Sequence, residues 1–133
     1  MKVKIDTKEK FTVITPEEEN LSANIAAELS ETAIPFIHSH TKNVVLNVKQ
    51  VATIDDMAAE QLAKLQQLFY ENNASFVICE VQNCIEQKLD ELELLEYLNI
   101  TPTESEAWDI VQMEEIEREL LDNDDAEFNT HAE

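Results

Sequence analysis

The chain has 133 residues, a formal net charge of −20 and no glycine, and its length indicates a single domain with room for a hydrophobic core. Without glycine it cannot contain a phosphate-binding P-loop, a Gly-rich dinucleotide turn, an EF-hand loop or a G-x-S-x-G nucleophile elbow, because each needs backbone conformations that glycine supplies. Nine basic residues against 29 acidic ones argue against binding to nucleic acids or anionic membranes, and favour a basic protein partner.

The first part of the chain alternates between strand and helix patterns. The predicted elements are a β-hairpin from strands at 3–5 and 11–14, a helix over 22–36, a strand at 44–48 and a helix over 58–72. Ser22 is a suitable N-cap for the first helix, and Pro35 is expected to end or kink it. The apolar run 44–48 is continuous, which is typical of a strand buried on both faces.

The same alternation continues to the last helix. The predicted elements are a second buried strand at 76–79, a helix over 85–92, an edge strand at 98–100 and a helix capped by Thr101 or Thr103. Trp108 on that helix is expected to pack against the sheet. The order predicts an α/β fold with a four- to five-stranded, mainly parallel mixed sheet packed with about four helices.

The C-terminal part differs in charge from the rest of the chain. Residues 89–133 contain 16 acidic residues and one arginine. We expect a domain over 1–112, then an acidic helical extension over 113–133 that ends in a disordered tail from Asp122. Met113, Ile116 and Leu120 form a narrow apolar stripe, which either folds back on the domain or serves as a docking or homodimer contact.

Several classes of site are not supported by the residues present. His38 and His40 lack an obvious third ligand, and Cys79 and Cys84 lack a base and an oxyanion site, so we expect no metal, no cofactor and no enzymatic activity. The start of the chain has no signal-peptide pattern and no apolar run reaches 18 residues, which favours a cytoplasmic protein with no direct membrane insertion.

The strand at 44–48 leads to Asp55-Asp56-Met57-Ala58 at the start of a helix. This arrangement resembles the STAS domain of bacterial anti-sigma factor antagonists, whose signature is an apolar strand followed by Asp-Ser-Ser-Gly-Leu at a helix start. The next strand and the last helix fit the same pattern. The resemblance covers about residues 1–112.

In that family the second Ser of the motif is phosphorylated by the anti-sigma factor, which is itself a kinase. The unphosphorylated form binds that kinase and frees the sigma factor. In an ungapped alignment Met57 occupies the phosphoacceptor position, and a thioether cannot be phosphorylated. If the alignment slips by one residue, Asp56 occupies the position and weakly imitates a permanent phosphate. Thr53 is the alternative phosphoacceptor.

The resemblance implies a non-enzymatic, protein-binding module in bacterial transcription regulation, whose partner is a kinase-type anti-sigma factor. Asp55 is expected to cap the helix and Met57 to offer an apolar contact. The expected partner-binding residues are Thr53, Asp55, Asp56, Met57, Ala58, Glu60 and Gln61. The alternative is a STAS-like accessory subunit of a membrane transport complex of the lipid-transport ATPase type.

Overall fold

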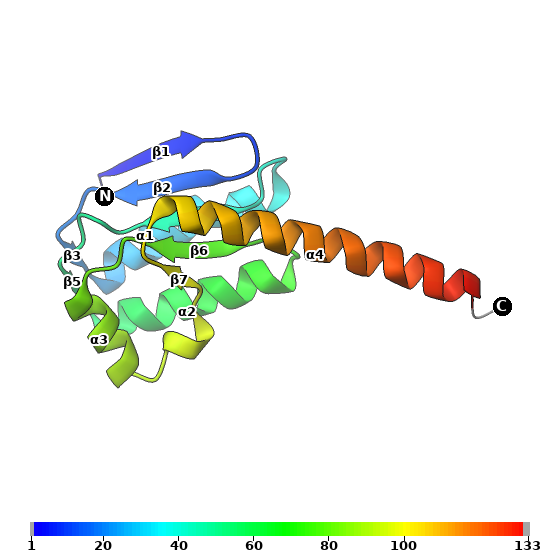
Figure 1. The fold of residues 1–133 in the computed structure, drawn as a ribbon. Helices are drawn as coiled ribbons and strands as arrows, with labels where there is room; N and C mark the ends of the chain where they lie inside the picture. Colours follow the sequence, from blue (N-terminus) through cyan, green and yellow to red (C-terminus); the bar gives the residue numbers. More distant parts are fainter. Residues whose placement is uncertain (1, 132–133) are drawn as a thin grey trace.

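A computed structural model describes residues 2–131 of the chain, with side chains described for residues 2–121. The elements of this part are β1 (Val3–Thr7), β2 (Thr12–Pro16), β3 (Asn20–Leu21), α1 (Ala23–Ala33), η1 (Ile34–His38), β4 (Val44–Asn47), β5 (Thr53–Ile54), α2 (Asp56–Glu71), β6 (Phe76–Cys79), α3 (Asn83–Glu91), η2 (Leu95–Tyr97), β7 (Ile100–Thr101) and α4 (Glu104–His131). Their arrangement is shown in Figure 1.

The central sheet has five strands in the order β1-β2-β4-β6-β7. β1 and β2 form the antiparallel hairpin, with Ile5 opposite Ile14. β2, β4, β6 and β7 run parallel to one another, and β7 is the short edge strand. The predicted fold class, a mainly parallel mixed sheet packed with about four helices, is therefore confirmed.

Helices cover both faces of the sheet, which explains why β6 is apolar throughout and β4 is apolar up to its last residue, Asn47. Leu46 and Ile78 lie in the larger buried cluster, together with residues of α1, α2 and α3. Their neighbours Val45 and Val77 lie in a smaller cluster that includes Val111 of α4. Successive side chains of a strand point to opposite faces, so a strand between two helical layers needs an apolar residue at nearly every position.

The local sequence explains where α1 begins and where it ends. The Ser22 hydroxyl oxygen accepts a hydrogen bond from the Ile25 backbone N–H at 3.3 Å, which confirms the predicted N-cap. α1 ends at Ala33, and Pro35 lies at the start of the 3-10 turn η1 that follows. Pro35 has no N–H to continue the α-helical ladder, so the change to a tighter turn at this point has a simple cause.

α4 begins at the predicted cap. The Thr103 hydroxyl oxygen accepts a hydrogen bond from the Glu106 backbone N–H at 3.1 Å. The helix is assigned through His131, whereas the composition favoured a disordered tail from Asp122. The side chains from Asp122 onward lie outside the described residues, and the division of the chain at residue 112 stays a prediction.

Trp108 lies at the margin of the α4 layer. Its ring centroid is 6.4 Å from that of Phe11, and 39% of the residue is exposed. We expected this side chain to pack against the sheet, but it instead covers Phe11, which precedes β2 and is itself buried. The burial of Ala107 and Val111 on the same helix explains this, since they occupy the sheet-facing side.

A second, two-stranded ladder was missed by the sequence analysis. β3 and β5 pair in parallel, with Asn20 opposite Thr53 and Leu21 opposite Ile54. Two residues are too few to show an alternating pattern. This ladder lies directly before α2 and therefore sets how the chain enters that helix.

Three turns use the left-handed region of backbone space without glycine. Asn73, Glu80 and Glu93 have φ values of 56°, 57° and 60°. Asparagine tolerates this region because its short polar side chain bonds locally, whereas glutamate has no such advantage. Glu80 comes directly after β6, so this turn reverses the chain at the carboxyl end of the sheet.

Candidate functional site

The predicted binding residues lie at the start of α2, on a surface that we call the α2 edge, residues 53–61. Backbone hydrogen bonds join the start of this segment to β3 and to Glu19, the residue before it. The N–H groups of Ala52 and Thr53 both donate to the Glu19 carbonyl, at 2.7 and 3.1 Å, and the Asp55 N–H donates to the Leu21 carbonyl at 3.0 Å. The start of α2 is thus held in one position by the β3–β5 ladder.

The helix α3 supports the same segment from the other side. The Cys84 thiol donates to the Ala52 carbonyl at 3.2 Å, and the Gln82 side-chain amide donates to the Lys49 carbonyl at 3.3 Å. Both carbonyls belong to the loop between β4 and β5. A loop with its backbone groups engaged in this way is ordered by its neighbours.

Asp55 occupies the N-cap position of α2 with extended backbone angles, φ −78° and ψ 154°. Its backbone carbonyl accepts from the Ala59 N–H at 2.9 Å. The predicted position is therefore correct, but the side chain makes no capping hydrogen bond. The carboxylate is exposed and free to face a partner.

Asp56 and Met57 form the first exposed turn of α2. The Asp56 carboxylate lies 2.9 Å from the Lys88 Nζ of α3. The hydrogen bond to Asp56 raises the pKa of Lys88. The Met57 side chain forms no ion pair and is 64% exposed.

The other predicted residues divide into outward and inward groups. Thr53 is exposed, and its hydroxyl donates to the Asn20 side-chain oxygen. Glu60 is exposed as well. The Gln61 side-chain oxygen is buried and, within the described residues, has no hydrogen-bond partner, so this residue turns partly inward. Ala58 is a correction, since its 0% exposure places it in the core, where the helix faces the sheet.

A second polar cluster lies at the carboxyl ends of β4 and β6. The Asn47 amide donates to the Glu80 carboxylate at 2.5 Å and to that of Glu104 at 3.2 Å. The possible ligand atoms of Cys79, Glu80 and Glu104 all lie within 4.8 Å of one another. Sequence reasoning missed this group, because Glu104 is brought to the sheet only by the packing of α4.

The Cys79 thiol of this cluster is buried beside two carboxylates. Burial, together with the nearby carboxylates of Glu104 and Glu80, raises the pKa of the Cys79 thiol to about 12. In the metal-free protein the thiol therefore keeps its proton at neutral pH. The Asn47 amide already supplies hydrogen bonds to both carboxylates.

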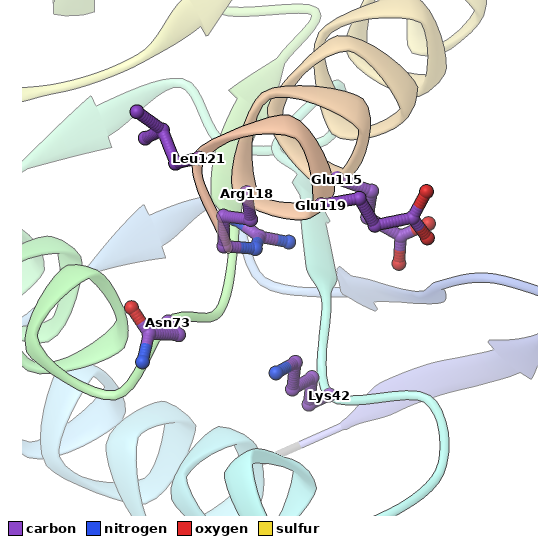
Figure 2. Close-up of a pocket in the computed structure, with 6 residues that line it drawn as sticks. All are labelled: Lys42, Asn73, Glu115, Arg118, Glu119 and Leu121. Atoms are coloured by element: carbon purple, nitrogen blue, oxygen red, sulfur yellow. The ribbon is translucent and has the colours of Figure 1, made fainter. Parts of the chain in front are cut away.

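The opposite end of the sheet has an open hollow of about 380 Å³ under α4. Figure 2 shows it, with Arg118 pointing from α4 toward the sheet. It is lined by Lys42, Asn73, Glu115, Arg118, Glu119 and Leu121. Its residues include no nucleophile with a base, so it offers no catalytic grouping.

Arg118 anchors α4 at this end. Its guanidinium donates to the Ser75 hydroxyl at 3.2 Å and to the Asn43 side-chain oxygen at 3.3 Å. Asn43 in turn donates to the Glu115 carboxylate at 2.5 Å. Asn43 and Ser75 directly precede β4 and β6 and are both buried. The sequence shows Arg118 only as a lone cation among acids, with no sign of this role.

The two histidines lie apart from these features. His38 and His40 are exposed near the turn after α1. Neither belongs to the one group of metal-ligating side chains found among the described residues. Within the same part of the chain, no helix has the length and apolar character that crossing a membrane requires.

Comparisons with known proteins agree with this architecture. A STAS domain structure from Planctomyces limnophilus superposes with a TM-score of 0.70 at 17% identity, covering 83% of this chain and 97% of that one. A candidate anti-sigma factor antagonist from Thermotoga maritima gives 0.69 at 16% identity, with 83% and 94% covered.

A larger protein contains the same fold as one of its parts. The murine solute carrier 26 family member A9 anion transporter gives a TM-score of 0.65 at 14% identity, covering 78% of this chain and 18% of that one. No curated protein matches the sequence. The sequence model of the STAS domain matches residues 2–107. The chain therefore belongs to the STAS domain family.

Proposed function

We propose that the protein is a non-enzymatic, cytoplasmic regulator that binds a kinase-type anti-sigma factor through the α2 edge, and that phosphorylation does not switch it there. The observation that carries this proposal is the exposure of Met57. An apolar side chain that is 64% exposed on the first turn of a helix gains free energy when a partner covers it. It also has no hydroxyl group to receive phosphate.

The surroundings of Met57 favour a partner with basic groups. Asp55, Asp56 and Glu60 are exposed around it, so an apolar contact is surrounded by negative charge. Charges at the rim of an interface mainly set its specificity and association rate. The exposed methionine would then supply most of the contact energy.

The alternative that Asp56 imitates a phosphate is less well supported. Its carboxylate pairs with Lys88 at 2.9 Å, so part of its single charge is neutralised. A phosphate group carries nearly two charges and three acceptor oxygens. A paired aspartate is therefore a poor substitute, and the α2 edge resembles the unphosphorylated surface of the family more closely.

A binding comparison of two exposed apolar side chains, Met57 and Tyr97, tests the proposal. The bait is the tagged protein, and the partner is the kinase-type anti-sigma factor encoded in the same genome. Met57→Glu is expected to abolish binding, because it places a charge at the centre of the contact. Tyr97→Glu is the matched control, since Tyr97 is 60% exposed in η2, and it should bind as the wild type does.

Two outcomes would contradict this function. Equal binding by Met57→Glu and wild type would move the interface away from the α2 edge. Recovery of transporter subunits in place of an anti-sigma factor would favour the accessory-subunit alternative, since a STAS-like fold also occurs within an anion transporter.

A further inference from the structure

The outward face of α4 has a short apolar seam. Met113, Ile116 and Leu120 are 59%, 55% and 53% exposed, and their spacings of three and four residues place them on one side of the helix. We call these three residues the outer stripe. More than half of each residue is exposed to solvent.

The stripe cannot turn inward, because the opposite side of α4 is already attached. Ala107 and Val111 are fully buried against the sheet. Arg118 donates to Ser75 and Asn43. These contacts at both ends of the segment hold the helix in one rotation, so the outer stripe faces solvent.

The spacing of the stripe matches one repeat of a two-stranded coiled coil. With Met113 and Leu120 at successive a positions, Ile116 takes the d position, and Glu117 and Glu119 take the flanking e and g positions. Both glutamates are exposed. Residues at e and g determine which helix can pair alongside, through the sign of their charges.

We propose that the outer stripe binds an amphipathic helix of another protein that carries basic residues beside its apolar seam. A second copy of this chain does not fit, because pairing two α4 helices would bring the glutamates of both e and g positions against each other. Between residues 104 and 121 the helix has seven acidic residues and only Arg118 as a cation. A helix with lysine or arginine at its own e and g positions satisfies both the charge and the apolar contact.

The position of α4 leaves space for such a helix. Figure 1 shows α4 extending well past the strands of the sheet. At 28 residues and about 1.5 Å per residue, the helix is about 42 Å long, far longer than strands of four or five residues. A partner helix can therefore lie along α4 without meeting the rest of the domain.

A set of synthetic peptides tests this proposal without knowing the partner. The probe is a fluorescent helix of about three heptads with Leu at a and d and Lys at e and g. One control peptide has Glu at e and g, and another has the Lys/Leu composition in shuffled order. Binding to the full chain is followed by fluorescence anisotropy at about 50 mM and about 300 mM salt.

We expect the Lys peptide to bind, more weakly at the higher salt, and the Glu peptide not to bind. The shuffled peptide should bind at least about tenfold more weakly than the Lys peptide. The variant Ile116→Gln/Leu120→Gln should also weaken binding at least about tenfold, since Gln keeps helix propensity and adds no charge. Tyr97→Gln is the matched control, since Tyr97 is 60% exposed in η2, and it should bind as the wild type does.

Three results would overturn the proposal. Equal binding of the shuffled peptide would mean that charge alone attracts it. Unchanged binding by Ile116→Gln/Leu120→Gln, with circular dichroism showing an intact fold, would remove the stripe from the contact. A wild-type dimer in sedimentation velocity that this double variant dissociates would make a second copy the occupant.

Discussion

Arg118 provides the sharpest test of how α4 is held on the domain. It is the only arginine of the chain, and its guanidinium donates to Ser75 and to Asn43 at 3.2 and 3.3 Å. Arg118→Ala removes both bonds. Asn43 keeps another donor, the Ser75 backbone N–H at 2.9 Å, whereas the Ser75 hydroxyl oxygen loses its cationic donor.

The expected loss follows from these contacts. A well-formed hydrogen bond to a charged group contributes about 1.5–3 kcal/mol. Both bonds here are long and Arg118 is only partly buried, so we expect about 2 kcal/mol for the two together. In a chain of this size that corresponds to a fall of about 8 °C in Tm.

Urea unfolding measures the effect, with the fluorescence of the single Trp108 and far-UV circular dichroism as two probes. Arg118→Lys keeps the charge but loses the planar fork, and should fall between wild type and Arg118→Ala. Glu119→Ala is the control on the same turn and should change stability by less than about 0.5 kcal/mol. If Arg118→Ala costs no more than Glu119→Ala, the anchoring role of the guanidinium is wrong.

Four further outcomes are expected. Phe69→Ala should cost about 3–5 kcal/mol in urea unfolding, because the ring is fully buried and its centroid lies 5.3 Å from that of the tilted Phe76 ring; a loss below about 1.5 kcal/mol would contradict this packing. Ser22→Ala should cost about 1 kcal/mol through the lost N-cap, and equal unfolding midpoints for the two proteins would show that the cap contributes nothing. With a thiol reagent at pH 8, Cys84 should react and Cys79 should not until the protein unfolds. Two fast-reacting thiols in the native protein would refute the burial of Cys79. The pKa of Cys79 rises from 9.0 to about 12 on folding, so above pH 9 the native state keeps a proton that the unfolded state loses. The free energy of unfolding should therefore fall as the pH rises above 9. After incubation with the cognate kinase and ATP, mass spectrometry should find no phosphate on residues 53–58. Phosphate on Thr53 would contradict the proposal that phosphorylation does not switch the α2 edge.

The sequence predicted those parts of the fold that depend on local pattern. The apolar run of β4 and the Ser22 cap both follow from residues close in the chain, and both are present in the structure. The β3–β5 ladder was missed because two residues carry no periodicity. The polar cluster around Asn47 was missed for a different reason, since its members come from three separate elements.

Within the α2 edge, too, some features follow from the local sequence and others depend on tertiary contacts. The resemblance placed Asp55 at the helix start, and the structure agrees. It could not separate Met57 from Ala58, because which of two neighbours faces solvent depends on the rotation of the helix against the sheet. That rotation is set by tertiary contacts, and it leaves Met57 outside and Ala58 in the core.

The left-handed turns have a further consequence in a chain without glycine. A glycine at such a turn would leave nothing there but backbone. Here the turn after β6 carries the carboxylate of Glu80, which bonds Asn47 across the ends of two strands, and the turn after α2 carries Asn73, which lines the hollow beside Arg118. Replacing either residue with glycine would relax the backbone, but it would also remove the Glu80 bond to Asn47 or the Asn73 side chain that lines the hollow. In this protein the residues that form these turns therefore also supply polar side chains that glycine would lack.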